Sequence, residues 1–159
     1  MSWNTTTAIP TPTGDIDTYK KKPGEHHQIP VTSTKCMGHN LTDQRVNYFH
    51  AKWKLIEWQD KPGHWVPPGL YHYESAPDNY TGVTWYICNC KYFYPDKAPA
   101  WELDQVQQIL DDQCGQFQSG WVWSKKWEKG YNVVPTEWFK PRLRIQRKKP
   151  ICPRGCFFW

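Results

Sequence analysis

The sequence predicts an α+β fold in which an antiparallel sheet, one clear helix and abundant loops are stabilised by three disulfides. Three observations lead to this prediction. Residues 84–94 are mostly β-branched, aromatic and cysteine residues, which favour a strand. Residues 98–114 carry apolar side chains at helical spacing. Six cysteines in a chain of 159 residues are typical of an oxidised, secreted protein.

The first part of the chain predicts little regular structure. Residues 1–35 are rich in Thr and Pro and predict an irregular arm, with a candidate short edge strand at residues 29–31. Residues 36–159 are expected to form a single domain. Helical and strand periods compete around residues 51–58, where we favour a strand. Residues 70–73 predict a short strand between loops rich in Pro and Gly.

The stretch at residues 84–94 is expected to be the central strand. Because successive side chains of a strand alternate, one face should carry Tyr86, Cys88, Cys90 and Tyr92, and the other Trp85, Ile87, Asn89 and Lys91. A bond between the two cysteines of this strand would need a close and specific approach of their Cα atoms that an extended strand does not provide. Each cysteine is therefore expected to cross-link a different element.

The helix at residues 98–114 is the most secure element. Leu103, Val106, Leu110 and Cys114 recur on one face, and a glycine follows at the expected C′ position. Beyond it, residues 120–123 predict a short strand, and residues 127–131 a turn or a single helical turn.

Alternating basic and apolar residues at 142–147 predict a further half-buried strand near the C-terminus. Leu143 and Ile145 would point inward from it.

All six cysteines are predicted to form structural disulfides: Cys36, Cys88, Cys90, Cys114, Cys152 and Cys156. Because Cys114 ends the inward face of the helix, we predict that it bonds Cys88 or Cys90. The other of these two is predicted to bond Cys36 or one of the two C-terminal cysteines. The C-x-C and C-x₃-C spacings fit a zinc site poorly, and we expect no metal and no cofactor.

Several features agree with an extracellular protein. Three N-glycosylation sequons begin at Asn4, Asn40 and Asn79. No apolar run reaches transmembrane length, and the first residues lack the basic and apolar regions of a signal peptide, so we expect a mature, secreted form. The net charge of +5 is only mildly basic and does not by itself imply nucleic acid, which we do not expect as a partner.

No catalytic motif is evident, and we expect no enzyme activity. A secreted nuclease would need acid–base pairs near phosphate-binding cations. Its candidate residues are His50, Glu57, His72, Arg142 and Arg144. Their spacing does not demand this chemistry, and solvated surface positions explain them equally well.

Other candidate catalytic or metal-binding groups are better explained as solvated side chains. The acidic residues of the helix are expected on its exposed face: Glu102, Asp104, Asp111 and Asp112. The adjacent His26 and His27 lie in the polar arm and are expected to be solvated rather than metal ligands.

Two surface features have a functional alternative. The first is a basic run made of Lys140, Arg142, Arg144, Arg147, Lys148 and Lys149. A charged strand edge usually prevents edge-to-edge aggregation, and the alternative is contact with an anionic partner. The second is the pair Trp121 and Trp123, which would share one strand face as a sugar-stacking platform requires, although most tryptophans are expected in the core.

Four segments carry a resemblance to a known class of proteins. They are Cys88-Asn-Cys90-Lys91, the helix that ends in Cys114-Gly115, the strand Gly120-Trp-Val-Trp123, and Trp127 followed by Lys129-Gly-Tyr131. They resemble small secreted cysteine-rich proteins of filamentous fungi. Together with Pro135-Thr-Glu-Trp138, which leads into a basic segment and a cysteine, they are similar to the LARS group, the Leptosphaeria avirulence and suppressing effectors.

The resemblance covers about residues 84–156 and implies an antiparallel sheet of about four strands overlaid by a helix and long loops. It also implies a non-enzymatic effector, or avirulence protein, that is secreted into the plant apoplast. The implied partners are a host plant protein or immune receptor, or another fungal effector, and we expect a monomer. The alternatives are a secreted carbohydrate-binding module that uses surface tryptophans and a secreted nuclease-like toxin.

Overall fold

The computed structural model describes residues 28–145, 150–153 and 156. The predictions made for His26, His27, Arg147, Lys148 and Lys149, and most of the predicted arm, therefore lie outside the described residues. The described end of the predicted arm packs against the rest of the fold, since Ile29 is buried and its backbone N–H donates to Oε1 of Gln105 at 2.5 Å.

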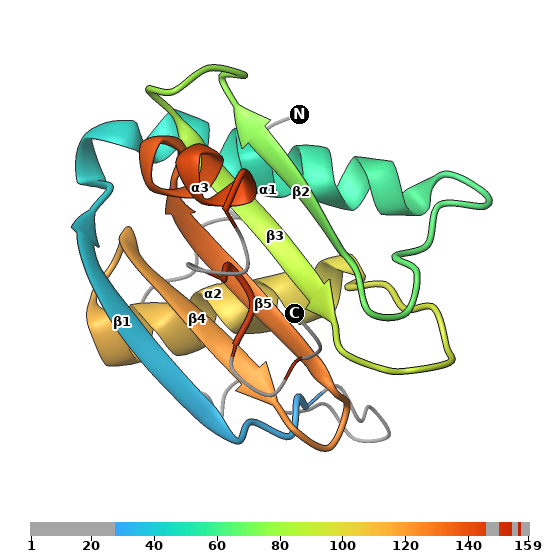
Figure 1. Cartoon of the computed structure of the whole chain (residues 1–159). Helices are drawn as coiled ribbons and strands as arrows, with labels where there is room; N and C mark the ends of the chain where they lie inside the picture. The colour runs from blue at the N-terminus through green and yellow to red at the C-terminus, as the bar shows by residue number, and fades with distance from the viewer. Residues whose placement is uncertain (1–27, 146–149, 154–155, 157–159) are drawn as a thin grey trace.

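The protein is built on one five-stranded, fully antiparallel sheet with the strand order β1-β4-β5-β3-β2 (Figure 1). The strands are β1 Ser33–Asn40, β2 Tyr71–Ala76, β3 Val83–Asn89, β4 Gln118–Ser124 and β5 Lys129–Pro135. The helices are α1 Arg45–Asp60, α2 Ala100–Cys114 and α3 Thr136–Leu143, with a 3₁₀ turn η2 at Thr42–Gln44. The predicted α+β class is confirmed, with one strand more than the four expected.

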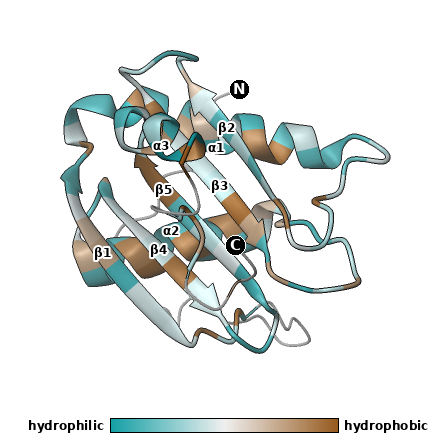
Figure 2. Cartoon of the chain, viewed as in Figure 1, coloured by the Kyte–Doolittle hydropathy of each residue, from teal (hydrophilic) through white to brown (hydrophobic). Residues whose placement is uncertain are grey.

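The sheet is covered on both faces, which gives the protein three layers. In Figure 1, α1 and α2 lie behind the sheet, while α3 and the C-terminal segment lie in front of it. Hydrophobic residues are concentrated in the central strands β3 and β5 and in parts of α2 (Figure 2). Every residue of β3 and β5 is buried, as expected for strands that are covered on both sides.

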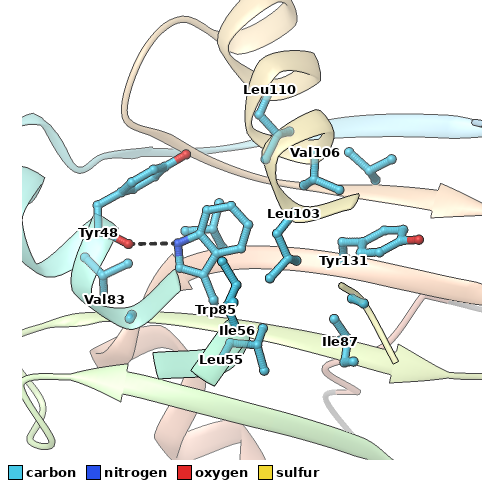
Figure 3. Packing of buried hydrophobic residues seen from close by; sticks show 14 of the residues in the cluster. Tyr48, Leu55, Ile56, Val83, Trp85, Ile87, Leu103, Val106, Leu110 and Tyr131 are labelled. Carbon is cyan, nitrogen blue, oxygen red and sulfur yellow. Dashed lines mark hydrogen bonds between the residues drawn. The ribbon is translucent and has the colours of Figure 1, made fainter. Parts of the chain in front are cut away.

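The rear core joins α1 and α2 to the sheet. Trp85 of β3 is fully buried there, and its Nε1–H donates to the backbone carbonyl of Tyr48 in α1 at 3.0 Å. Leu103, Val106 and Leu110 point from α2 toward the same layer (Figure 3). The predicted helix at residues 98–114 and its apolar face are thereby confirmed, within two residues at its start.

The front core is smaller and contains the other face of β3. Tyr86, Cys88 and Cys90 belong to it, together with Phe139 of α3 and Ile151 of the C-terminal segment. The hydroxyl of Tyr86 donates to the carbonyl of Ile151 at 2.5 Å. The predicted alternation is therefore confirmed for residues 85–88, because Trp85 and Ile87 belong to the rear core, but it is wrong for Tyr92, which is exposed after the strand has ended.

Three disulfides are present, Cys36–Cys114, Cys88–Cys152 and Cys90–Cys156. The predicted bond from Cys114 to β3 is wrong. Cys88 and Cys90 face the front layer, whereas α2 packs behind the sheet and ends beside β1, where Cys36 lies. The alternative in which a β3 cysteine reaches the C-terminal pair is confirmed, and here both cysteines do so.

Two of the predicted strands are not formed by the described residues. Residues 51–58 belong to α1, in which Tyr48, Ala51, Leu55 and Ile56 form one buried helical face. The second error concerns residues 142–147, where α3 continues to Leu143 and Ile145 is exposed. Leu143 lies one turn after Phe139, so both side chains reach the front core from the same side of a helix.

Three strand limits also differ from the prediction. The edge strand β1 begins at Ser33 rather than at residues 29–31. The central strand β3 ends at Asn89, so the residues from 90 to 94 form a loop. Residues 129–131, which were expected to belong to a turn or a single helical turn, are the start of β5, the middle strand of the sheet. The short strands expected at residues 70–73 and 120–123 correspond to β2 and β4.

Candidate functional site: an exposed aromatic patch

Three consecutive aromatic residues lie exposed on the loop between β3 and α2. Tyr92, Phe93 and Tyr94 expose 70%, 81% and 69% of their surface. Large apolar side chains that gather on a surface commonly mark an interaction site. These residues were expected inside the central strand, and the early end of β3 at Asn89 places them in solvent instead.

A second loop adds two exposed apolar residues at the same end of the sheet. Val66 and Asp96 pair through two backbone hydrogen bonds of 2.8 and 3.0 Å, which hold residues 62–70 beside residues 90–97. Trp65 and Leu70 are about half exposed on this second loop. The five residues Trp65, Leu70, Tyr92, Phe93 and Tyr94 are called the aromatic patch below. Both loops lie at the lower right of Figure 1.

The buried side chain of Asn89 closes the base of the patch. Its Nδ2 donates to the carbonyl of Val66 at 3.0 Å and to the carbonyl of Tyr94 at 2.8 Å. Its Oδ1 accepts from the backbone N–H of Lys91 at 3.1 Å. One amide side chain therefore satisfies backbone groups of both loops and fixes the curvature of the chain around the aromatic residues.

A largely buried ionic network anchors the other end of the loop. Asp96 accepts from Lys91 and, at 3.0 Å, from Lys129 of β5. Lys129 also contacts Glu102 of α2 at 2.9 Å, and the hydroxyl of Tyr131 donates to Glu102 at 2.7 Å. The expectation that Glu102 lies on an exposed helix face is wrong, and the same is true of Asp111, because both are buried behind the sheet.

Burial and neighbouring charges shift the pKa of three members of this network. Burial raises the pKa of Glu102 even though Lys129 and Tyr131 favour its ionised form. Burial also acts on Asp96, but Lys129 and Lys91 outweigh it and lower the pKa of that carboxyl. Burial, and then the neighbouring Glu102, raise the pKa of Tyr131 well above its ordinary value, so its hydroxyl stays neutral and able to donate.

The two rings of the predicted tryptophan platform are only partly exposed. Trp121 and Trp123 lie on the same face of β4, as expected from strand alternation. Trp123 packs against the front core, and the C-terminal segment passes close by, with Pro153 near Gly130 of the adjacent strand. These rings therefore present a smaller free surface than those of the aromatic patch.

The described part of the predicted basic run lies on or just after α3 rather than on a strand edge. Lys140 pairs with Asp78 at 3.3 Å. Arg142 stacks 4.2 Å above the ring of Trp138 and donates to its carbonyl at 2.8 Å. Arg144 is exposed after the end of the helix. Two of these three cations thus have partners within the chain.

The structure does not bring the nuclease candidates together. His50 and Glu57 are exposed on α1, behind the sheet, whereas Arg142 and Arg144 lie in front of it. His72 of β2 is stacked at 3.6 Å on the ring of Trp58 and contacts Glu74 at 2.8 Å.

Neither a metal site nor a membrane-spanning helix is found within the described ranges. No group of three or more His, Cys, Asp or Glu side chains there is arranged to hold a metal ion. No helix in that part of the chain has both the length and the hydropathy to cross a membrane.

Comparison of the chain with protein-family models, with curated proteins and with solved structures finds no match. Its function must therefore be inferred from its own residues, among which the aromatic patch is the most distinctive surface. The sequence contained one signal for it. Three adjacent aromatic residues would occupy both faces of a strand at once, and Pro95 follows them directly.

Proposed function

We propose that this protein is a secreted, non-catalytic effector that acts by binding another protein through the aromatic patch. The observation that carries this proposal is the exposure of Tyr92, Phe93 and Tyr94 on a loop whose base is fixed by buried polar contacts. Tyr and Trp are enriched among the residues that dominate protein–protein binding energy. A loop that is already ordered loses little conformational entropy on binding, which favours affinity.

A protein partner fits the patch better than a polysaccharide does. Sugar rings stack on flat aromatic surfaces, and a platform needs rings that lie close to one plane. The rings of Tyr92 and Phe93 are 6.2 Å apart and tilted by 43° to each other. An uneven surface of this kind is better matched by side chains of a protein that interdigitate with it.

A protein partner also fits better than an anionic membrane. Lipid binding by aromatic residues is usually supported by cations that face the headgroups. The lysines at the base of the loop are instead engaged within the chain. Lys91 binds Asp96 and the carbonyl of Trp127, and Lys97 binds the carbonyl of Gln59 and lies 4.4 Å above the ring of Trp65.

The extracellular setting and the effector role are supported by observations other than the aromatic patch. Three disulfides in a short chain are typical of secreted proteins. The segments between Cys88 and Trp138 that resemble fungal effectors suggest the plant apoplast as the compartment and a host protein or immune receptor as the partner.

The test is infiltration of the purified, oxidised protein into a panel of plant genotypes. The key variants are Phe93→Ala and the double variant Tyr92→Ala/Tyr94→Ala. Val46→Ala is the matched control because Val46 is an equally exposed apolar residue, at 77%, but lies on α1. We expect cell death in only some genotypes, lost in both patch variants and after reduction and alkylation, and kept in the control.

Three results would contradict the proposal. Cell death in every genotype would indicate a toxin or an enzyme. A genotype-restricted response that survives both patch variants would exclude the patch as the contact. No response in any genotype would count against the effector role.

A further inference from the structure

We propose that Asn79 and Asn40 are N-glycosylated, and that their glycans stand at the end of the sheet opposite to the aromatic patch. This inference rests on the secretion that the proposed function includes. It does not depend on the identity of the partner. Both residues begin Asn-x-Thr sequons, the pattern that accepts N-linked sugar.

Asn79 lies in the tight turn between β2 and β3 and is exposed to solvent. Its Oδ1 accepts hydrogen bonds from the backbone N–H of Thr81 at 2.8 Å and from the hydroxyl of Thr81 at 2.6 Å. Both bonds use the amide oxygen, and Nδ2, the atom to which the sugar is attached, makes no hydrogen bond to any described residue. A glycan at this position would displace no contact of the fold.

Asn40 repeats this arrangement at the end of β1. Its Oδ1 accepts from the backbone N–H of Thr42 at 2.9 Å, from the hydroxyl of Thr42 at 2.5 Å and from Nε2 of Gln118 at 3.1 Å. Asn40 is exposed, and its Nδ2 likewise makes no hydrogen bond within the described part of the chain. Two sequons far apart in sequence therefore present the same free atom in the same local geometry.

The modification is a group transfer from a lipid-linked oligosaccharide pyrophosphate. A bond forms between Nδ2 of the asparagine and the anomeric carbon of the first sugar, and Nδ2 loses one proton. The bond between that carbon and the pyrophosphate oxygen breaks, and the pyrophosphate leaves with the electron pair. No oxidant or reductant is required.

Strand register places both sequons at the end of the sheet that lies farthest from the patch. Val83, just after the turn that contains Asn79, pairs with Pro135 at the end of β5, and Asn40 pairs with Gln118 at the start of β4. The patch follows Asn89, which pairs with Lys129 at the start of β5. Figure 1 shows the β2–β3 turn at the top, the end of β1 at the upper left, and the loop after β3 at the lower right.

The separation between the sequons and the patch is close to the length of a strand. A strand of seven residues, such as β3, spans about 20 Å at about 3.3 Å per residue. Sugars at Asn79 would cover the neighbouring Tyr80, which is about half exposed. They would leave Tyr92 and Tyr94 open to a partner.

The test uses the full chain with an added secretion leader in a eukaryotic host that performs N-glycosylation. Enzymatic release of the glycans in ¹⁸O water converts each modified Asn into a labelled Asp, and peptide mass spectrometry then gives the occupancy of each site. We expect label at Asn79 and Asn40. It should be lost in Thr81→Ala and Thr42→Ala, respectively, and kept in Thr81→Ser and Thr42→Ser.

Mild iodination of the folded protein tests the placement of the glycans. Labelling of Tyr80 should fall at least several-fold in the glycosylated form relative to Asn79→Gln, while labelling of Tyr92 and Tyr94 stays unchanged. Secreted, folded protein with an unmodified asparagine would overturn the assignment at that position, and shielding of Tyr92 or Tyr94 would overturn the placement. Because the leader is supplied, these outcomes are separate from success or failure of the plant assay.

Discussion

The buried carboxyl of Asp111 provides a sharp test of the electrostatics of this fold. One of its oxygens, Oδ2, is buried without a hydrogen-bond partner. Lys52, the cation that acts on Asp111, is directed elsewhere, since it contacts Asp104 at 2.6 Å and Gln107 at 2.8 Å. Burial therefore dominates and raises the pKa of Asp111 from its ordinary value of 3.8 to about 7, although Lys52 acts in the opposite direction.

The sign of the resulting pH dependence follows from proton linkage. The folded state holds a proton on Asp111 up to about pH 7, whereas the unfolded chain releases it near pH 4. The folded state therefore binds more protons in this window, and the free energy of unfolding falls as the pH rises through it. The rise in pKa from 3.8 to about 7 sets a ceiling of about 4 kcal/mol, at about 1.4 kcal/mol per pH unit. Water screening and local relaxation reduce such terms, and we expect about 2 kcal/mol.

The variant Asp111→Asn keeps the shape of the side chain and removes its charge. We expect it to be more stable than the wild type by about 2 kcal/mol at pH 8, because the wild type alone must bury a carboxylate there. The difference should nearly vanish at pH 4, where the wild-type side chain is neutral in the fold. Urea unfolding of the oxidised protein, followed by tryptophan fluorescence at both pH values, measures the difference.

Asp60→Asn is the matched control, because Asp60 is an exposed aspartate at the end of α1 and does not act on Asp111. We expect this variant to change stability by less than about 0.5 kcal/mol at either pH. The reasoning would be refuted if Asp111→Asn were less stable than the wild type at pH 8. A difference that is equal at pH 4 and pH 8 would refute it as well, because a packing effect does not titrate.

Three further predictions concern the cross-links and the anchoring of the chain. Cys36–Cys114 should be reduced before the other two disulfides, because Cys36 is exposed and all four cysteines of those two bonds are buried. Alkylation and mass spectrometry at increasing thiol concentration give the order in which the three disulfides are reduced. Lys129→Met should lower the free energy of unfolding by about 3–5 kcal/mol, since the buried Glu102 loses its cation and Asp96 keeps only Lys91, whereas exposed Lys126→Met should have almost no effect in the same urea assay. Gly120→Ala should cost about 1–3 kcal/mol in that assay, because the added Cβ would lie 2.7 Å from a backbone oxygen of β1.

The spacing of apolar residues was sufficient to predict an element where one of its faces is apolar and the other is polar. The α2 helix and the alternation of β3 were predicted for this reason. The same logic fails for β5, because both of its faces are covered and its sequence shows no alternation. In α1 both periods fitted the sequence, and the charged Lys52 is buried against α2, which only the tertiary structure could reveal.

The bond predicted from Cys114 to Cys88 or Cys90 was wrong because the face of the sheet that α2 covers was not known. Alternation correctly placed Cys88 and Cys90 opposite Trp85 and Ile87. If α2 had been assigned to the Trp85 face, Cys114 would have been excluded as a partner of either β3 cysteine. The sequence does not state which face the helix covers, because aromatic residues occur on both faces of that strand.

The polar anchoring of the aromatic patch also has a physical reason that the sequence does not reveal. Apolar residues in place of a buried ion pair often hold a fold as stably, so the network around Lys129 is weak evidence for stability alone. Hydrogen bonds and ion pairs are directional, however, and those from Asn89 and Lys129 fix the backbone on both sides of the exposed rings. Apolar side chains in their place are not directional, so the loop could shift while those side chains stayed buried. The network therefore holds Tyr92, Phe93 and Tyr94 in one arrangement, and this ordering supports the protein-binding role that we propose for the patch.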